Sequence, residues 1–268
     1  MKLLKAIIKF LFLQINGIAE LFGIKLFFHR SNSVHNPVIY DQYMWQPYYE
    51  EFDEIKLYQK AQVASFSEKY DNPYKQLRFY SLQNVFKNIL NNNIKGDIVE
   101  CGVWKGHSAY ILSTLLNETN ENKEFHIFDS FEGGLSDKKE QDKNKRFNLS
   151  DNQINKEKLL FSSTEEQVKS SLSKFKNIKY YKGWIPDRFS EVNIKEFSFV
   201  HIDVDLYQPT LDSLNFFYPL ISKGGAMVID DYGISTFPGA KKAVDEFLFL
   251  NKPSFFYKVP FGSCFIIK

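Results

Sequence analysis

Two pairs of aspartates near the C-terminal end of the chain have the residue type and the spacing that metal chemistry requires. Asp203 and Asp205 close the run Phe-Val-His-Ile-Asp-Val-Asp. Asp230 and Asp231 close the run Ala-Met-Val-Ile-Asp-Asp. Each apolar run predicts a buried strand, and ligands of parallel sheets bind beyond the carboxyl ends of the strands. Several carboxylates in one pocket would repel one another, and a hard divalent cation, Mg²⁺ or Mn²⁺, is their natural neutraliser.

Strand and helix patterns alternate around these pairs, which is typical of a parallel sheet with helices on both faces. The predicted strands are 98–101, 125–129, 178–182, 197–203 and 226–230, followed by a hairpin of 254–259 and 263–267. The predicted helices are 76–92, one from near Gly106, one from Ser163 with Glu166 at capping-box spacing, one after Pro209 to about Tyr218, and 238–250. We therefore expect an α/β, Rossmann-like, doubly wound sheet of five parallel strands plus a C-terminal β-hairpin, with an N-terminal helical cap.

A glycine-containing turn follows the first predicted strand, with the sequence Glu-Cys-Gly-Val-Trp-Lys-Gly from Glu100. Gly102 allows the backbone to approach a ligand closely, and the following helix N-terminus offers free N–H groups. Glu100 would attract a cationic or hydroxyl-bearing ligand. The spacing of a phosphate-binding loop is absent, and a tight strand–helix turn without a ligand is the alternative.

The second predicted strand ends at Asp129, which Ser130 follows. An acidic residue at this place suits hydrogen bonds to ribose hydroxyls, and a helix N-cap is the alternative. Taken together, the Glu100 and Asp129 motifs predict a nucleoside-type cofactor that lies over the first two strands.

Five motifs occur in a characteristic order: Glu-Cys-Gly-Val-Trp-Lys-Gly, Asp-Ser-Phe-Glu-Gly, Gly-Trp, Ile-Asp-Val-Asp-Leu-Tyr and Ile-Asp-Asp-Tyr-Gly. Over about residues 77–250 this set resembles the macrocin O-methyltransferase family. Members of that family have the class I methyltransferase fold and methylate sugar hydroxyls of antibiotics with S-adenosylmethionine and Mg²⁺. The resemblance does not cover the N-terminal 75 residues and does not specify the acceptor.

The resemblance implies a role for each matched residue. It makes Asp203, Asp230 and Asp231 the metal ligands and Asp205 the general base, so that Asp205 and Asp203 are the expected catalytic residues. The S-adenosylmethionine site that it implies consists of Glu100, Gly102, Val103, Gly106, Ser108, Asp129, Ser130, Trp184 and Asp203. Two positions depart from the family pattern: Val204 stands where glycine is common, and His107 stands where a small residue is common.

The chemistry of methyl transfer also suits four aspartates. A metal bound to two neighbouring sugar oxygens lowers the pKa of a hydroxyl, and a nearby carboxylate then removes the proton. We therefore expect an O-methyltransferase that acts on a sugar or glycan with vicinal hydroxyls. The alternatives are a metal-dependent glycosyltransferase that uses Asp203-Val-Asp205, a non-enzymatic scaffold, and strand-end capping without a metal.

Four histidine and lysine positions outside these motifs can also be interpreted. His201 shares a strand face with Asp203, so either a hydrogen bond to a metal-binding carboxylate or ordinary packing is expected. His126 lies inside a predicted strand and is expected in the core. Lys241 and Lys242 are expected on a solvated helix face.

The composition excludes several classes of protein. The 268 residues carry a formal net charge of +2, which gives no indication of nucleic-acid binding. The two cysteines, Cys101 and Cys264, lie in predicted strands, as expected for reduced thiols in a cytoplasmic protein. No Cys/His cluster has zinc spacing.

The N-terminal region is predicted to be distinct from the rest of the chain. We expect an amphipathic helix and a cap region at 1–75 and a methyltransferase domain at 76–268. Charged residues interrupt the apolar segment at 3–28, so no stretch reaches the roughly 20 residues that span a bilayer. Contact of residues 1–28 with a membrane surface and packing on another subunit of a homo-oligomer both remain open.

Two segments have no periodic pattern. Residues 31–75 are expected to be irregular and to cap the sheet. Residues 133–160 are rich in Lys, Asp and Asn and predict a long surface loop, which we expect to act as a lid.

Overall fold

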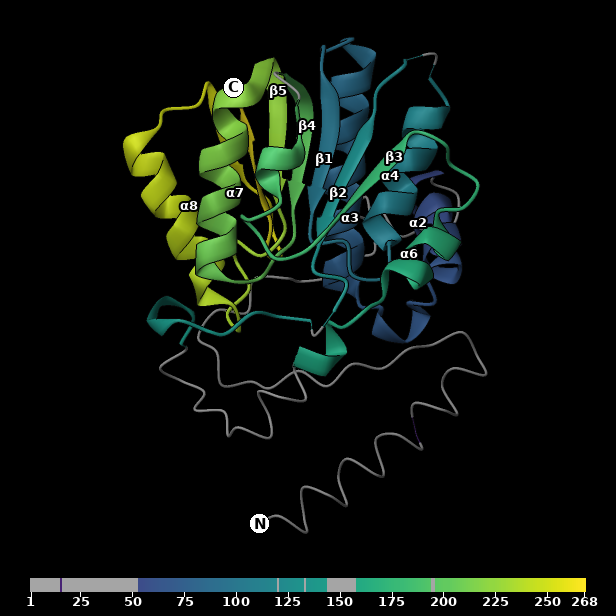
Figure 1. The fold of residues 1–268 in the computed structure, drawn as a ribbon, viewed down its shortest axis with the longest axis horizontal. Coiled ribbons are helices and arrows are strands. Elements are labelled where there is room, and N and C mark those ends of the chain that lie inside the picture. The colour runs from purple at the N-terminus through teal and green to yellow at the C-terminus, as the bar shows by residue number, and fades with distance from the viewer. Residues whose placement is uncertain (1–14, 16–52, 120, 133, 144–157, 194–195) are drawn as a thin grey trace. The chain divides into compact units, whose positions relative to one another are not determined.

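The computed structural model describes residues 15, 53–119, 121–132, 134–143, 158–193 and 196–268 (Figure 1). The chain divides into two compact units, 1–45 and 46–268, and the fold described below is that of the second. The predicted N-terminal helix and most of the predicted lid lie outside the described residues. In the described part of the chain, none of the helices has both the length and the apolar character of a membrane span.

A seven-stranded sheet forms the centre of the second unit, in the order β3-β2-β1-β4-β5-β7-β6 (Figure 1). The strands are β1 (Asp97–Cys101), β2 (Phe125–Asp129), β3 (Ile178–Lys182), β4 (Phe197–Ile202), β5 (Ile221–Ile229), β6 (Phe255–Lys258) and β7 (Cys264–Ile267). Strands β1 to β5 pair in parallel, β7 pairs antiparallel with β5, and β6 pairs antiparallel with β7. The predicted sheet of five parallel strands with a terminal hairpin is confirmed. Its strand order reverses between β1 and β4, where ligands of doubly wound sheets bind.

Helices cover both faces of this sheet. They are α2 (Asp53–Ala64), α3 (Pro73–Asn91), α4 (His107–Asn117), α6 (Glu165–Ser171), α7 (Tyr207–Phe217) and α8 (Pro238–Leu250). Short 3₁₀ turns are η1 (Glu68–Tyr70), η2 (Glu140–Asp142), η3 (Phe189–Glu191) and η4 (Tyr218–Leu220). Helices α2, α3, α4 and α6 pack in one core cluster, and α7 and α8 pack in the cluster on the opposite face (Figure 1).

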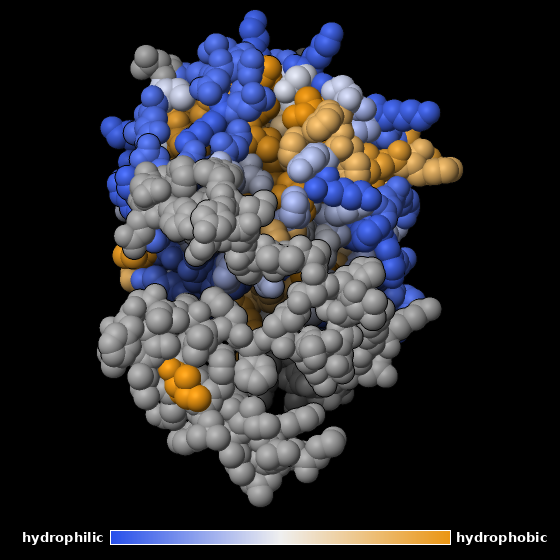
Figure 2. Space-filling view, turned by 180° about the vertical axis from the view of Figure 1, so that it is seen from behind, coloured by the Kyte–Doolittle hydropathy of each residue, from blue (hydrophilic) through white to orange (hydrophobic). Residues whose placement is uncertain are grey.

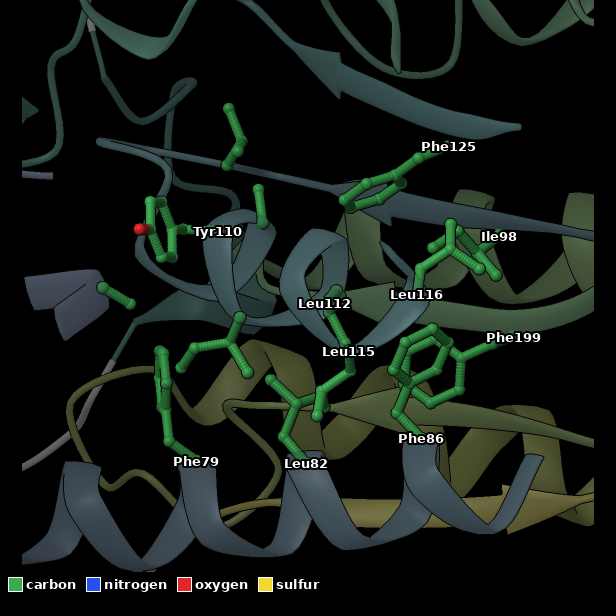
Figure 3. Close-up of a cluster of buried hydrophobic side chains, with 14 of the residues drawn as sticks. Phe79, Leu82, Phe86, Ile98, Tyr110, Leu112, Leu115, Leu116, Phe125 and Phe199 are labelled. Carbon is green, nitrogen blue, oxygen red and sulfur yellow. The ribbon is translucent and has the colours of Figure 1, made fainter. Parts of the chain in front are cut away.

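Alternation along the strands explains the two cores, because successive side chains of a strand point to opposite faces. Ile98 of β1 belongs to the α3 and α4 side, whereas the next residue, Val99, belongs to the α7 and α8 side. The Phe86 ring of α3 lies 4.9 Å from the Phe199 ring of β4. Figure 3 shows the side chains through which α3 and α4 meet, Phe79, Leu82, Phe86, Leu112, Leu115 and Leu116.

Three predictions of local structure need correction. The region 31–75 is not irregular throughout, because α2 has the buried helical stripe Ile55, Tyr58 and Ala61. Helix α3 begins at Pro73 rather than at residue 76, with its N-cap side chain on the preceding asparagine. The capping box of α6 is Thr164 with Gln167, one residue later than the predicted pair of Ser163 and Glu166. The sequence fits both pairs, because each has a hydroxyl residue three positions before a Glu or Gln.

Most of the described surface in the view of Figure 2 is hydrophilic, and hydrophobic side chains show in smaller groups. The large apolar side chains that are more than two-thirds exposed are Phe66, Leu159, Phe249 and Leu250. Scattered residues of this kind are normal on a folded protein and need no functional explanation.

Candidate functional site

A cavity opens at the carboxyl edge of the sheet, beside the point where the strand order reverses. It contains about 610 Å³ of space not filled by atoms, part of it open to solvent, which is within the usual range for small-molecule sites. Its lining residues come from the end of β2, from the loops that follow β1, β2, β3 and β4, and from the first turn of α7: Gly102, Trp104, Phe128, Asp129, Ser130, Gly134, Leu135, Ser136, Phe161, Gly183, Trp184, Ile185, Asp203, Val204, Asp205 and Pro209.

Three of the four predicted aspartates converge at this edge. Asp203 follows β4 and Asp230 and Asp231 follow β5, and one carboxylate oxygen from each lies within 4.8 Å of the others. Burial, followed by the charges of Asp230 and Asp231, raises the pKa of Asp203 well above its usual range. Burial, followed by the charges of Asp205 and Asp230, raises the pKa of Asp231 in the same way. The carboxylates are therefore close enough to repel one another, and their hard oxygen atoms are of the kind that Mg²⁺ prefers.

Asp205 is held beside the cluster by its backbone. Its φ of 60° lies in the left-handed region, which aspartate tolerates better than most residues. In this conformation the Asp205 N–H donates a 3.0 Å hydrogen bond to Asp231 Oδ2. Asp205 is one of the residues that line the cavity, and its role as general base stays a prediction.

Gly102 permits the close approach of two strand ends. A Cβ atom at this position would lie 2.0 Å from the carbonyl oxygen of Asp203, and the φ of 80° is one that glycine adopts most easily. The close approach is thus to the neighbouring strand as well as to the cavity. Gly106, the N-cap of α4, also has a positive φ, of 88°.

Asp129 ties the loop after β1 to the loop after β2. Its Oδ2 accepts hydrogen bonds from the N–H groups of Val103 at 2.8 Å and Trp104 at 3.2 Å. Its Oδ1 accepts one from Phe131 N–H at 2.8 Å. Burial raises the pKa of Asp129 despite these bonds. Asp129 therefore shapes the cavity wall, and its bonding to ribose stays a prediction.

Glu100 and His201 form a buried pair beneath the cavity. Glu100 Oε1 lies 2.7 Å from His201 Nδ1, both side chains are fully buried, and neither residue lines the cavity. Burial lowers the pKa of His201, but the hydrogen bond and charge of Glu100 outweigh it and the net direction is upward. His201 thus bonds to Glu100 rather than to a metal-binding carboxylate, because the two face each other across β1 and β4. A contact between Glu100 and the cofactor stays a prediction.

Some of the remaining predicted cofactor residues line the cavity, and others are buried behind its wall. Ser130 and Trp184 line the cavity, and Trp184 is 39% exposed. Ser108 is buried in the first turn of α4. His107, which stands where a small residue is common in the family, packs against α2 and α3, with its Nε2 3.1 Å from the carbonyl oxygen of Tyr58.

Two cationic residues that the sequence did not single out face the carboxylates from α3. Arg78 Nε donates to Asp230 Oδ2 at 2.9 Å. Lys75 is nine-tenths buried, and burial lowers its pKa to about 8 although the charges of Asp203 and Asp230 raise it. The signal available in the sequence was weak: two cations three residues apart at the start of a helix with an apolar stripe.

A second group with metal-like spacing lies at the start of β1 and β2, formed by Asp97, Glu124 and His126. Here a cation is already in place, because Lys179 Nζ lies 2.5 Å from Glu124 Oε2, and the His126 ring Nε2 lies 3.5 Å from Asp97 Oδ2. This group therefore has the features of a structural ion-pair network. Among the described residues, the cluster of Asp203, Asp230 and Asp231 is the better candidate for a metal site, because Asp203 lines the cavity at the carboxyl edge and none of Asp97, Glu124 and His126 does.

Solved structures with the same arrangement of elements are class I methyltransferases. The O-methyltransferase NovP matches with a TM-score of 0.66 and 20% identity, over 80% of this chain and 98% of that chain. A calicheamicin methyltransferase matches with a TM-score of 0.50 and 17% identity, over 82% of this chain and 94% of that chain. The class I methyltransferase fold predicted from the sequence is thereby confirmed.

Residues 74–252 match the model of the macrocin O-methyltransferase (TylF) family, and the chain belongs to that family. A demethyldecarbamoylnovobiocin O-methyltransferase of Streptomyces niveus is 26% identical over 175 residues, 63% of this chain and 64% of that protein. A mycinamicin III 3''-O-methyltransferase of Micromonospora griseorubida is 27% identical over 177 residues, which are 63% of this chain and 67% of that protein. The chain thus covers less than two thirds of the first relative's length.

Proposed function

We propose that this protein transfers the methyl group of S-adenosylmethionine to a hydroxyl of a sugar or sugar-containing molecule, at a site that holds a divalent cation. The observation that carries the proposal is the convergence of Asp203, Asp230 and Asp231 at the carboxyl edge of a class I methyltransferase sheet. Family membership supports it, and so does a relative from Streptomyces olivaceus, 27% identical over 165 residues, whose name is that of a 4'-O-methyltransferase for a rhamnosyl-tetracenomycin C. The glycosyltransferase alternative loses its support, because the matching family is one of methyltransferases.

The donor set fits a hard cation such as Mg²⁺. Asp203, Asp230 and Asp231 would hold it, because one oxygen of each lies within 4.8 Å of the others and a cation would relieve the repulsion that raises the pKa of Asp203 and Asp231. A cation bound there would lower the pKa of a coordinated sugar hydroxyl.

Residues of this chain would remove the proton and bind the cofactor. Asp205 lines the cavity beside the cluster and is positioned to take the proton of the acceptor hydroxyl as its oxygen bonds to the methyl carbon. The electron pair of the broken C–S bond goes to sulfur, so S-adenosylhomocysteine leaves. The cavity walls at Trp104, Asp129 and Trp184 would bind the nucleoside part and exclude water from the methyl group.

The first test is calorimetric titration of the full chain with S-adenosylhomocysteine, with and without Mg²⁺. We expect binding, and we expect turnover when nucleotide sugars and glycans are screened as acceptors with Mg²⁺ present. Asp203→Asn and Asp230→Asn should lower kcat by at least about 100-fold, the usual scale for losing an electrostatic or acid–base group, with S-adenosylhomocysteine affinity largely kept. Asp205→Asn should also lower kcat by at least about 100-fold and keep S-adenosylhomocysteine affinity, but it should leave metal affinity unchanged.

Asp53→Asn is the matched control, because Asp53 is an exposed carboxylate of α2 whose side chain is 90% exposed. It should behave as wild type. The metal assignment would be wrong if Asp230→Asn kept near-normal turnover, and the methyltransferase proposal would be wrong if the wild-type chain bound no S-adenosylhomocysteine.

A further inference from the structure

The first turns of α3 lie against the carboxylate cluster. Lys75 and Arg78 are three residues apart, so they lie on one face of the helix. Arg78 Nε donates to Asp230 Oδ2 at 2.9 Å, with only 13% and 7% of the two side chains exposed. Arg78 Nη1 also points to the carbonyl oxygen of Phe261, at 3.5 Å, in the turn between β6 and β7. The guanidinium is thus fixed between a helix, a strand end and a hairpin turn.

The contact uses one oxygen of Asp230 and leaves the other. Asp230 Oδ1 makes no hydrogen bond with any described residue, and Asp230 is also one of the three carboxylates with ligand-like spacing. A carboxylate turns easily about its last torsion, so an unheld Asp230 would sample many orientations. The Arg78 contact selects one orientation and keeps one oxygen free for a cation.

Lys75, on the same helix, lies near the carboxylates but makes no directed contact with them. Its ammonium lies over the rings of Phe79 and Trp104, 5.2 and 5.3 Å from their centres, and makes no ion pair or hydrogen bond with the described residues. It feels the charges of Asp203 and Asp230 without contacting either. Lys75 therefore supplies positive charge near the cluster, whereas Arg78 supplies charge and a directed contact.

We propose that Arg78 is a positioning residue of the metal site, which holds the Asp230 carboxylate so that it converges with Asp203 and Asp231. The inference rests on the proposed function, because that function places the cation at these three residues. Groups that hydrogen-bond to a ligating carboxylate orient it, and losing one typically costs 10–100-fold in metal affinity. Charge alone acts in the opposite direction, since a neighbouring cation repels Mg²⁺.

The test is Mg²⁺ affinity measured by calorimetry, and Mn²⁺ affinity by electron paramagnetic resonance, on the full chain. Arg78→Met should bind both metals at least tenfold more weakly. Arg78→Lys keeps the charge and an ammonium that can still donate to Asp230, but it loses the planar guanidinium that also reaches Phe261. Its metal affinity should therefore fall between those of wild type and Arg78→Met. Lys75→Met is the matched control, because it removes a charge that faces the same carboxylates, and its metal affinity should equal or exceed that of wild type.

The outcomes separate this inference from the proposed function. A wild-type chain that binds neither metal at millimolar concentration would remove the metal from the proposed function and this inference with it. Metal binding in the wild type that is unchanged or tighter in Arg78→Met would overturn only the role of Arg78. Equal weakening in Arg78→Met and Lys75→Met would also overturn it, because Lys75 makes no contact with Asp230 and the loss could then not be assigned to the directed contact of Arg78.

Circular dichroism and thermal unfolding should first establish that each variant is folded. If Arg78→Met is not, Arg78→Lys takes its place, with a loss of about threefold or more expected and an unchanged affinity overturning the inference. S-adenosylhomocysteine affinity without metal serves as a second readout. A positioning role leaves it close to the wild-type value, whereas general damage to the site would lower it.

Discussion

At the scale of single residues, the site concentrates charge that the protein interior would otherwise avoid. Asp203 and Asp231 have raised pKa values because burial and neighbouring carboxylates disfavour their ionised forms. Lys75 is a cation buried beside them without an ion-pair partner among the described residues. Such groups destabilise a fold, and they occur mostly where function requires them.

Lys75→Met should therefore stabilise the free protein. The folded-state pKa of Lys75 is about 8, against 10.5 as its ordinary value, so burying the charge costs up to about 3 kcal/mol below pH 8. Between pH 8 and 10.5 the folded protein has already released this proton while the unfolded chain still holds it. Wild-type stability therefore rises through this range, and the advantage of Lys75→Met should shrink. Chemical denaturation in EDTA across pH 7–10.5 measures the difference in free energy of unfolding between Lys75→Met and wild type.

Lys87→Met is the control for this experiment. Lys87 lies on the same helix but is paired with Glu54, its Nζ 2.8 Å from Glu54 Oε1. We expect Lys87→Met to leave stability unchanged or slightly lower. A stabilisation by Lys75→Met that is the same at pH 7 and pH 10.5 would mean that packing, not buried charge, explains it.

At the scale of elements, loops that follow the strands build the site, and contacts with helices hold those loops in place. Asp142, in η2 after β2, is 3% exposed, and its Oδ1 accepts the N–H of Tyr207 at 2.7 Å. Helix α7 begins there, and its own N-cap residue, Leu206, provides no side-chain cap. Asp142 therefore supplies from a distant loop the cap that α7 lacks, and it fixes the flank of the predicted lid against that helix.

Asp142→Ala should lower the free energy of unfolding by about 1–2 kcal/mol, the usual cost of losing a cap. The measurement is urea unfolding monitored by circular dichroism. Asp137→Ala is the control, because Asp137 lies in the same loop, is 97% exposed and, in the part of the chain that the structure describes, forms an ion pair only with Lys158. It should change stability by less than about 0.5 kcal/mol. Equal effects from the two substitutions would contradict the capping role.

At the scale of the whole molecule, the loops after β1, β2, β3 and β4 meet at one edge of a single sheet, so ligands bound there should couple to global stability. A ligand at 100 times its Kd stabilises the folded state by about 2.7 kcal/mol. S-adenosylhomocysteine with Mg²⁺ should therefore raise the Tm by roughly 5–10 °C in a domain of this size. Differential scanning fluorimetry measures this shift.

Asp203→Asn separates the two ligands in that experiment. The Mg²⁺-dependent part of the Tm increase should disappear, because one of three carboxylates is lost. An increase with Mg²⁺ that is the same in the variant and the wild type would place the cation elsewhere. The absence of any shift with S-adenosylhomocysteine in the wild type would argue against the proposed function.

The sequence alone determined the sheet and the position of the acidic pairs. Apolar runs of strand length and helical periodicity are local signals, and they identified β1 to β5, the hairpin and most helices. Residues that directly follow strands must lie at the carboxyl edge, so the meeting of Asp203, Asp230 and Asp231 followed from chain order.

Only the tertiary structure decided what surrounds them. Arg78 lies 152 positions before Asp230, and Glu100 lies 101 positions before His201, so no local pattern indicates these contacts. The same holds for the cap that Asp142 gives to α7. Pairings of this kind depend on which side chains packing brings within a few ångströms, and sequence periodicity fixes the face of an element but not its partner.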